Sequence, residues 1–513
     1  MADNKFDVNN YSVAYWRMRP QWQDSINLYE PLPGGLSQYL FRYKSEDDAE
    51  FAERLKRLAQ VNFVEYVINH WCSMLFSTNP KISCSDSAKE DVDSFVNNCN
   101  GQGDTLHEYT RDMIAPSSFL YGIVDVVVDL PEAGNGFVTM ADEGDMGLRS
   151  PYIYIIPPLN RMSWALDNAK NYIKYCSYDI VNSQISAGMA IKDAKQYLEW
   201  TPDTVEQYDD AGNSLGVKDN PYGFVPIVSV LHKNSQRFFS DKIGISLIKD
   251  VVPLQKLIIN LVSLIFDYHE QTNFTHRVII QDMDNGADEE APTQAEALAM
   301  SAHRVTRLPG KGSRLDLLTP DPAGVESMHN LLSKMVELLF LSCGLASDYG
   351  QNKTHQSEAT VRANNTGVFN RLGVMARQFE KADKKIIETA LRVQGYDDAD
   401  IVEAAVTVEW DTNFSYAPFM NAIEELTALK AVIGDISTTA IKEFAKATIA
   451  PKLGTSKDWD TITEEIEAYD GPAAPVAPFA APVNPDMPPN AALSKAAAVE
   501  SPTDKEDNSP VES

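Results

Sequence analysis

Three long apolar stripes at helical spacing are the strongest pattern in this sequence. They cover residues 243–266, 322–344 and 361–390, and a polar excursion separates the first two. Apolar residues recur in each at steps of three and four, as on the buried face of a helix. We therefore expect a helix, a polar excursion, a returning helix, a polar loop and a second very long helix. Helices of this length need neighbours throughout, which favours a ring of subunits packed side by side over a compact enzyme core.

Apolar positions of the first two stripes are candidates for packing between the helices. The return helix is expected to pack against the first helix or against a neighbouring subunit, because its apolar residues share one face. The five candidate packing residues are Leu257, Leu261, Leu332, Met335 and Leu339.

The rest of the chain mixes helical and strand patterns. A core-facing helix is predicted over residues 45–77, where acidic residues at the start suit a helix N-terminus. Strand-like runs, which are short and rich in β-branched and aromatic residues, occupy residues 123–128, 152–156, 172–180, 224–231 and 405–410. Two more helices are predicted at 420–433 and 437–447. The fold class that follows is α+β and predominantly helical.

Composition limits what the chain binds. Asp and Glu outnumber Lys and Arg by 73 to 44, which gives a net charge of -29. Phosphate contacts need clustered cations, so this charge argues against a protein that grips nucleic acid over a broad surface. It does not exclude a surface along which nucleic acid slides. The five cysteines lack CxxC spacing, which predicts free thiols in a reduced, cytosolic setting.

No membrane partner is expected from the sequence. The first thirty residues lack the pattern of a signal peptide. The most apolar run, residues 257–266, is interrupted by Asn260 and Ser263 and is shorter than the roughly 20 residues that cross a bilayer.

Motifs that carry catalytic or metal chemistry are lacking. Residues 309–313 resemble a phosphate loop only superficially, since Val305 replaces its first glycine and Gly312 the hydroxyl residue after Lys311. The eight histidines are scattered without ligand spacing, and neither GxSxG nor GxGxxG occurs. The sequence therefore predicts no catalytic residues, no metal and no cofactor.

Two polar segments are candidates for binding. The first is a cationic run of Arg304, Arg307, Lys311 and Arg314 within the excursion, which is either a solvated loop or a docking surface for a protein partner or nucleic acid. The second is the loop between the second and third long helices, which is either a generic connector or a functional loop. Its polar residues are Asp348, Tyr349, Lys353 and His355.

Several short motifs resemble those of portal proteins from tailed bacteriophages, most closely the long-tailed type. Their order along residues 10–450, joined to the plan of long helices, makes the resemblance more specific than any single motif. The motifs are Tyr121-Gly122-Ile123-Val124, Arg161-Met162-Ser163-Trp164, Pro221-Tyr222-Gly223-Phe224, Gly244-Ile245-Ser246, Cys343-Gly344-Leu345 and Trp410-Asp411-Thr412-Asn413.

The resemblance implies a division of the chain into the parts of a portal subunit. These parts are a wing (1–240), a first stem helix (241–272), a clip (273–321), a second stem helix (322–344), a tunnel loop (345–357), a long wing helix and strand (358–410), a crown (411–470) and a Pro/Ala-rich tail (471–513). The composition of the tail also predicts disorder, because it cannot bury enough apolar surface.

It further implies a homo-oligomeric ring, usually a dodecamer, at one capsid vertex of the virion, assembled in the host cytoplasm. This head–tail connector would pass double-stranded DNA through its channel during packaging and ejection. Arg304, Arg307, Lys311 and Arg314 would lie in the clip, which docks the large terminase and then head-completion or adaptor proteins. The wing would contact the major capsid protein and scaffold, and Asp348, Tyr349, Lys353 and His355 would lie in the tunnel loop.

Two other classes of function stay open from the sequence. One is another phage structural protein, capsid-associated or an injection protein, without an axial channel. The other is an unrecognised nuclease or ATPase.

Overall fold

The computed structural model describes most of the chain up to Thr412. The described residues are 5–44, 46–131, 150–182, 193–238, 240–273, 276–280, 306–307, 314–318, 322–345, 358–412, 414 and 468. The chain forms two compact units, Met1–Asn421 and Ala422–Ser513, and nearly all described residues belong to the first. The predicted helices at 420–433 and 437–447 and the tail from 471 lie outside the described residues.

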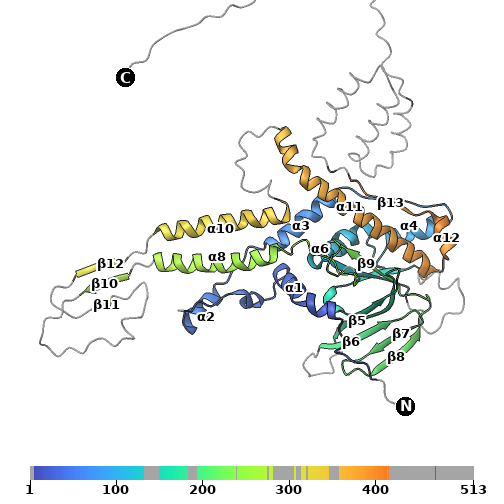
Figure 1. Ribbon diagram of the computed structural model, residues 1–513, viewed down its shortest axis with the longest axis horizontal. Helices are drawn as coiled ribbons and strands as arrows, with labels where there is room; N and C mark the ends of the chain where they lie inside the picture. The colour runs from blue at the N-terminus through green and yellow to red at the C-terminus, as the bar shows by residue number, and fades with distance from the viewer. Residues whose placement is uncertain are drawn as a thin grey trace, which may run out of the picture. The chain divides into compact units, whose positions relative to one another are not determined.

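Helices form the centre of the first unit. The principal ones are α1 (Val13–Tyr29), α3 (Phe63–Leu75), α6 (Ala115–Tyr121) and α11 (Glu358–Gln394). Trp22, Trp71 and Phe119 are fully buried between them, and Phe379 of α11 is 3% exposed. The predicted third stripe is thus confirmed as one helix of 37 residues, whose inner face covers the core (Figure 1).

The predicted helix over residues 45–77 is wrong in one respect, because it is two helices. The acidic start is confirmed: Asp47 caps α2 (Asp48–Lys56) in a capping box with Glu50. The chain then breaks, and Asn62 begins α3 by accepting a hydrogen bond from the backbone N–H of Glu65. Its amide also donates to the Tyr29 carbonyl at 2.7 Å, so a contact with α1 fixes the break.

Two antiparallel sheets lie beside the helices. The first has the order β3-β2-β9, with β2 (Ile123–Asp129) buried between β3 (Tyr152–Ile156) and β9 (Ile227–Leu231). The second is the meander β4-β5-β6-β7-β8. Its strands are β4 (Arg161–Leu166), β5 (Tyr172–Asn182), β6 (Asp193–Trp200), β7 (Thr204–Tyr208) and β8 (Ser214–Asp219). Strands β2, β3 and β5 confirm predicted runs, whereas β4, β6, β7 and β8 were not predicted.

Short elements complete this part of the chain. β1 (Lys81–Ser83) pairs antiparallel with β13 (Thr407–Glu409), which joins the N-terminal half to the end of the described chain. The remaining elements are η1 (Gly35–Tyr39), α4 (Lys89–Asn97), α5 (Leu106–Tyr109), η2 (Thr110–Ile114), η3 (Pro158–Asn160) and α12 (Asp398–Ala404). We call the helices, sheets and α11 described so far the core region.

The other two long helices form a hairpin. α8 (Val251–Asn273) and α10 (Pro322–Cys343) lie side by side and run in opposite directions (Figure 1). Between them in sequence is a small sheet with the order β11-β10-β12, made of β11 (Thr306–Arg307), β10 (His276–Ile280) and β12 (Arg314–Leu318). The predicted order of helix, excursion and returning helix is confirmed, and Gly344 ends α10 in a left-handed conformation with φ of 84°.

The first helix begins at Val251, whereas the apolar stripe predicted a start at Ile243. The segment before it is held against the core region by a very close approach of two backbones. A Cβ built on Gly244 would lie 1.7 Å from the Gly122 carbonyl oxygen, and Gly122 itself has φ of 90°. Pro253 adds a second reason, since inside a longer helix its ring would clash with the carbonyl four residues earlier. The mixed architecture confirms the α+β class.

Candidate functional site

The α8–α10 hairpin is the candidate functional site, because it carries the longest apolar surfaces outside the core region. Each helix spans about 35 Å at about 1.5 Å per residue. The hairpin connects the core region at one end to the β10–β12 sheet along the chain at the other. The position of the hairpin depends on the contacts that attach α8 to the core region. Polar side chains contribute to these contacts together with apolar packing.

Three polar residues of α8 bind the N-terminal segments of the core region. Gln255 is fully buried and donates to the Val61 carbonyl at 2.9 Å. Asn260 both donates to the Tyr39 carbonyl and accepts from the Phe41 N–H, each at 2.7 Å. Lys256 forms an ion pair with Asp24 at 2.6 Å. Buried hydrogen bonds of this kind fix the register of α8, because a shift would leave each polar group unpaired.

These contacts also bear on the membrane expectation. Residues Val251–His269 form a 19-residue stretch with mean hydropathy 1.4, so by length and composition α8 could cross a membrane. The prediction from residues 257–266 is therefore wrong about length, because the apolar part of the helix extends over Val251–His269. However, 44% of this stretch is buried inside the protein, and a core helix passes the same test. Because Gln255 and Asn260 are hydrogen-bonded to the core region, we interpret α8 as a core helix of this kind.

The inner face of α10 packs against α3 and α8. Leu339 and Cys343 are fully buried, and Val336 and Phe340 are each 5% exposed. The Phe340 ring meets Phe63 and Tyr66 of α3 edge-on, at centroid distances of 5.9 Å and 5.7 Å. Aromatic edge-to-face contacts stabilise packing beyond the free energy gained from burying apolar area. This face therefore holds the returning helix in place.

The outer face of α10 is also apolar but has no partner among the described residues. Leu331 and Leu338 are each 52% exposed and Leu341 is 60% exposed. At about 100° per residue these three side chains lie on the side of the helix opposite Leu339 and Phe340. An exposed ion pair between Lys334 and Glu337, at 2.6 Å, lies on the same side. A helix that is apolar on two opposite sides is typical of one that is buried on both.

The five predicted packing residues occupy different environments. Leu339 is fully buried and Leu261 is 9% exposed, while Leu332 and Met335 are half-buried against the main hydrophobic cluster. Leu257 is 47% exposed and so has little packing within its own chain. The role of these residues between subunits stays a prediction.

The entry to the hairpin is held by two residues of one predicted motif. The Trp164 indole N–H donates to the Asp241 carbonyl at 3.0 Å. The Arg161 guanidinium donates to the Lys242 carbonyl at 3.2 Å and stacks on the Trp164 ring at 3.5 Å. The Arg-Met-Ser-Trp motif therefore fixes the backbone that leads from the core region into α8.

Arg161 is fully buried, and its charge is balanced by Asp125 of β2. The Arg161 Nε lies 3.5 Å from the Asp125 Oδ2, which is an ion-pair distance without a hydrogen bond. Asp125 instead accepts hydrogen bonds from Tyr175 at 2.8 Å, Tyr172 at 3.2 Å and Ser229 at 2.6 Å. Burial raises the pKa of the Tyr175 hydroxyl well above its ordinary value, so it stays a donor. The three hydrogen bonds to Asp125 offset part of the cost of burying the pair, while the Arg161 Nε has no hydrogen-bond partner among the described residues.

The C-terminal end of α10 is held by Arg371 of α11. The Arg371 guanidinium donates to the Cys343 carbonyl at 2.7 Å and lies over the Trp71 ring at 4.9 Å. A Cβ on Gly344 would lie 2.9 Å from this guanidinium. The Cys-Gly-Leu motif thus joins α10 to α11 and α3, as the Arg-Met-Ser-Trp motif joins the core region to α8.

The structure places the predicted binding residues only in part. Register sets Arg307 of β11 beside Ile279, and Arg314 of β12 beside Ile280, so the two backbones flank neighbouring positions of β10. Arg304 and Lys311 lie outside the described residues, as do Asp348, Tyr349, Lys353 and His355.

One contact in the hairpin escaped the sequence reasoning. The Nε2 atoms of His269 on α8 and His329 on α10 lie 3.2 Å apart. Sixty positions separate them, so no local spacing signals the pair. Among the residues described, no group of three or more His, Cys, Asp or Glu is arranged to hold a metal ion. All five cysteines are free, as predicted.

Comparison with solved structures finds similar chains at low sequence identity. Two solved structures described as the neck of a GTA particle, one empty and one native, are similar to this chain. The first is 12% identical, covers 77% of this chain and 91% of its own, and has a TM-score of 0.43. The second is 13% identical, covers 86% and 99%, and has a TM-score of 0.42. No curated protein matches the sequence.

The family model described as "Phage portal protein, SPP1 Gp6-like" matches residues 39–468. This range contains the core region from the last residue of η1 onwards, the hairpin and the small sheet. The chain therefore belongs to the phage portal protein family, which makes it a structural component of the phage particle and confirms the resemblance of its motifs.

Proposed function

We propose that this protein forms a ring-shaped channel at one capsid vertex, through which double-stranded DNA enters during packaging and leaves during ejection. The observation that carries the ring is the outer face of α10, where Leu331, Leu338 and Leu341 are exposed although they lie on one side of the helix. Exposed apolar surface of this kind is typical of a face that another protein covers. A neighbouring copy of the same hairpin is the partner that repeats around a closed ring.

The parts of the chain have separate roles in this proposal. The α8–α10 hairpin forms the wall of the channel, and the β10–β12 sheet forms the clip, which docks the large terminase and later head-completion or adaptor proteins. The core region serves as the wing that faces the major capsid protein and scaffold. The loop with Asp348, Tyr349, Lys353 and His355 is the tunnel loop. Assembly takes place in the host cytoplasm.

The charge of the chain fits passage of DNA rather than tight binding. A net charge of -29 repels the phosphate backbone, so the duplex meets few deep binding sites as it moves. Cations at one end would then act locally, at the point where the motor or the DNA end is held.

Microscopy of the purified full-length protein tests the ring. Class averages viewed down the particle axis are expected to show a closed ring with a central hole. A monomer or an open filament at the same concentration would overturn the proposal. It would instead favour a capsid-associated protein without an axial channel.

The clip assignment is tested by reversing two charges, Arg304→Glu with Arg307→Glu. Rim charges mainly control association rate and salt dependence, so terminase binding and DNA packaging should fall while rings persist. Both quantities are measured at two salt concentrations. The matched control is Lys81→Glu with Lys89→Glu, which reverses two exposed charges in the core region. If both double variants behave alike, the cationic run is an ordinary solvated loop.

A further inference from the structure

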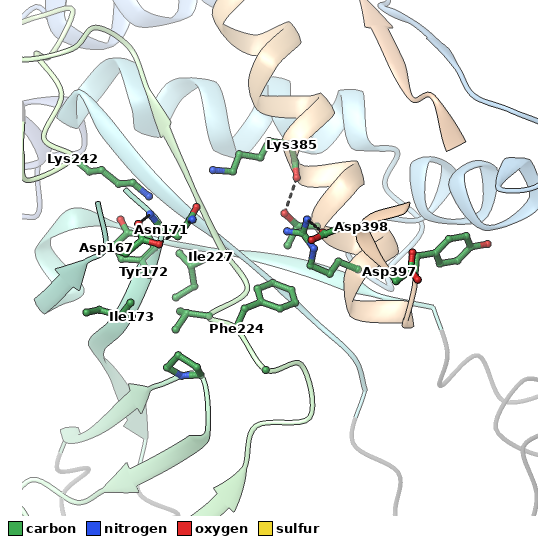
Figure 2. Close-up of a pocket in the computed structure, with 16 residues that line it drawn as sticks. Asp167, Asn171, Tyr172, Ile173, Phe224, Ile227, Lys242, Lys385, Asp397 and Asp398 are labelled. Atoms are coloured by element: carbon green, nitrogen blue, oxygen red, sulfur yellow. Dashed lines mark hydrogen bonds and ion pairs between the residues drawn. The ribbon is translucent and has the colours of Figure 1, made fainter. Parts of the chain in front are cut away.

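A cleft in the core region carries two lysines, Lys242 and Lys385, that form no ion pair with any residue the structure describes. The cleft has a volume of about 670 Å³ and lies between the turn before β5, the segment before β9 and the C-terminal end of α11. Figure 2 shows Lys242 and Lys385 extending from opposite walls toward the same space. Lys242 comes from the entry to the hairpin, and Lys385 from α11.

The other charged groups of the lining already have partners inside the protein. Asp167 accepts from the backbone N–H of Asn171 at 2.7 Å and from its amide at 3.2 Å. Asp397 caps α12 through two backbone N–H groups, and Arg392 is paired with Asp398 at 2.6 Å. The lining thus contains three positive and three negative residues, and each of the three carboxylates already accepts a hydrogen bond from another group of the protein.

The two lysines differ from this pattern. The Lys242 Nζ lies 4.0 Å from the centre of the Tyr172 ring, and neither Lys242 nor Lys385 forms an ion pair within the part of the chain that the structure describes. By contrast Lys384, the neighbour of Lys385, faces Glu388 at 3.8 Å. The direction of Lys385 into the cleft is thus a property of its position on the helix.

The cleft is a costly place for the Lys242 cation, whereas the Lys385 side chain is exposed. Burial lowers the pKa of Lys242 to about 8, and the next cause is the charge of Lys385. Arg161 acts in the same direction, while Asp125 and Asp167 act against it. An anion between the two ammonium groups would reverse the repulsion and form charge-assisted hydrogen bonds with both.

The floor of the cleft is apolar, which limits the kind of anion. Ile227, which is buried, lines the cleft together with Tyr172 and Phe224, and the Arg392 guanidinium lies over the Phe224 ring at 5.4 Å. Asp397 and Asp398 at the α12 end are exposed carboxylates. A nucleic acid backbone would bring phosphates close to these carboxylates, whereas a peptide with one acidic side chain beside an apolar one satisfies both the lysines and the floor.

We propose that this cleft binds an acidic segment of a partner protein, with one carboxylate between Lys242 and Lys385 and an adjacent apolar side chain on Phe224 and Ile227. The site lies in the core region and uses neither the outer face of α10 nor the clip. This proposal therefore goes beyond the proposed channel, and its test is independent of whether the protein forms a ring.

The test measures protection of individual lysines from acylation in the full-length protein at pH 8, read by mass spectrometry. The probes are the capped peptide Leu-Glu-Leu-Glu-Leu, the same peptide with Gln for Glu, inorganic phosphate and a short DNA duplex. The Glu peptide is expected to protect Lys242 and Lys385 but not Lys384, which serves as an internal reference. Lys385→Gln should weaken binding of the Glu peptide about three- to tenfold, the range of one or two charged contacts, while Lys384→Gln should leave it unchanged.

Four results would overturn the proposal. They are no protection by the Glu peptide, equal protection by the Gln peptide, equal protection by phosphate, and stronger protection by the DNA duplex. Equal loss of binding in Lys384→Gln and Lys385→Gln would also overturn it, since it would show a general charge effect. None of these results depends on whether rings form.

Discussion

The core region and the α8–α10 hairpin differ in where their largest apolar side chains are buried. In the core region Trp22, Trp71 and Phe119 are fully buried within one chain, and even the Arg161 charge is buried with its partner Asp125. In the hairpin one face of α10 is buried, while the opposite face leaves Leu338 and Leu341 more than half exposed. The core region thus buries its largest aromatic side chains within one chain, although it too leaves single apolar side chains exposed, such as Trp16 at 50% and Leu32 at 75%. The hairpin leaves apolar surface for which the same chain supplies no cover among its described residues.

The largest expected effect comes from Gly244→Ala, which attacks the junction between the two regions. The new Cβ would lie 1.7 Å from the Gly122 oxygen, and since both groups belong to the backbone no side chain rotation relieves the clash. We expect a loss of more than about 4 kcal/mol in the free energy of unfolding, or failure to fold. Denaturant unfolding measures it.

A glycine in open space provides the control for that variant. Gly367 lies inside α11 with no atom within 4 Å of a built Cβ. Gly367→Ala should be neutral or stabilising by about 0.5–1 kcal/mol, because alanine favours the helix. Equal stability of the two variants would show that the close approach of Gly122 and Gly244 does not exist.

Two neighbouring leucines of α10 separate the buried face from the exposed one. Leu339→Ala should cost about 2–5 kcal/mol in unfolding free energy, because the residue is fully buried. Leu338→Ala removes the same atoms from a side chain that is 52% exposed, so the single chain should lose less than about 1 kcal/mol.

Ring yield by microscopy completes this comparison. Leu338→Ala, alone or with Leu341→Ala, should lower ring yield while leaving the melting temperature of the unassembled chain almost unchanged. If rings form at wild-type yield with both leucines removed, the outer face of α10 is not the surface between subunits.

A smaller effect, dependent on pH, is expected from Asp383→Asn in the core region. Burial raises the pKa of the Asp383 carboxyl from 3.8 to about 7, although it accepts from the Trp410 indole N–H at 3.0 Å and from Thr110 at 3.4 Å. Because the folded pKa is raised, this group contributes stability below about pH 4 that is lost as the pH rises through 7. The asparagine keeps an acceptor for Trp410, so it should be more stable than wild type at pH 8, by at most about 4 kcal/mol.

The difference between the two proteins should vanish near pH 4 and grow up to pH 7, as measured by urea unfolding at each pH. His232 also titrates in this range: burial lowers its pKa to about 3, which costs stability as the pH falls below about 6.5. That cost is present in both proteins and cancels in the difference. A difference that is constant from pH 4 to 8 would contradict the assignment.

Local pattern alone predicted much of the fold. The stripes at 322–344 and 361–390 correspond to α10 and α11, because long apolar periodicity and a terminal glycine are local signals. Strands β7 and β8 were missed because they carry no clear alternation, and every residue of β8 is exposed. The start of α8 was placed too early because Ile243, Leu247 and Ile248 are buried against the core region from a non-helical segment, where their spacing imitates a helix.

For the candidate site too, the sequence predicted the motifs but not the contacts that they make. The order of the motifs identified the family, yet their contacts were not visible: Arg161 and Trp164 hold the chain at Asp241, seventy-seven positions beyond Trp164. The same limit hid the two lysines of the cleft, since Lys242 and Lys385 are far apart in sequence and each is an ordinary residue by itself.

The sequence by itself determined the family, the order of long helices and the acidic character, because periodicity, capping residues and charge are properties of short segments. Tertiary structure decided which apolar residues are buried. Leu338 and Leu339 are identical in type and adjacent in sequence, yet one is 52% exposed and the other fully buried. It also decided which charges are paired, as Lys384 and Lys385 show. Burial and pairing depend on what another part of the chain places within a few ångströms, and periodicity within one segment contains no such information.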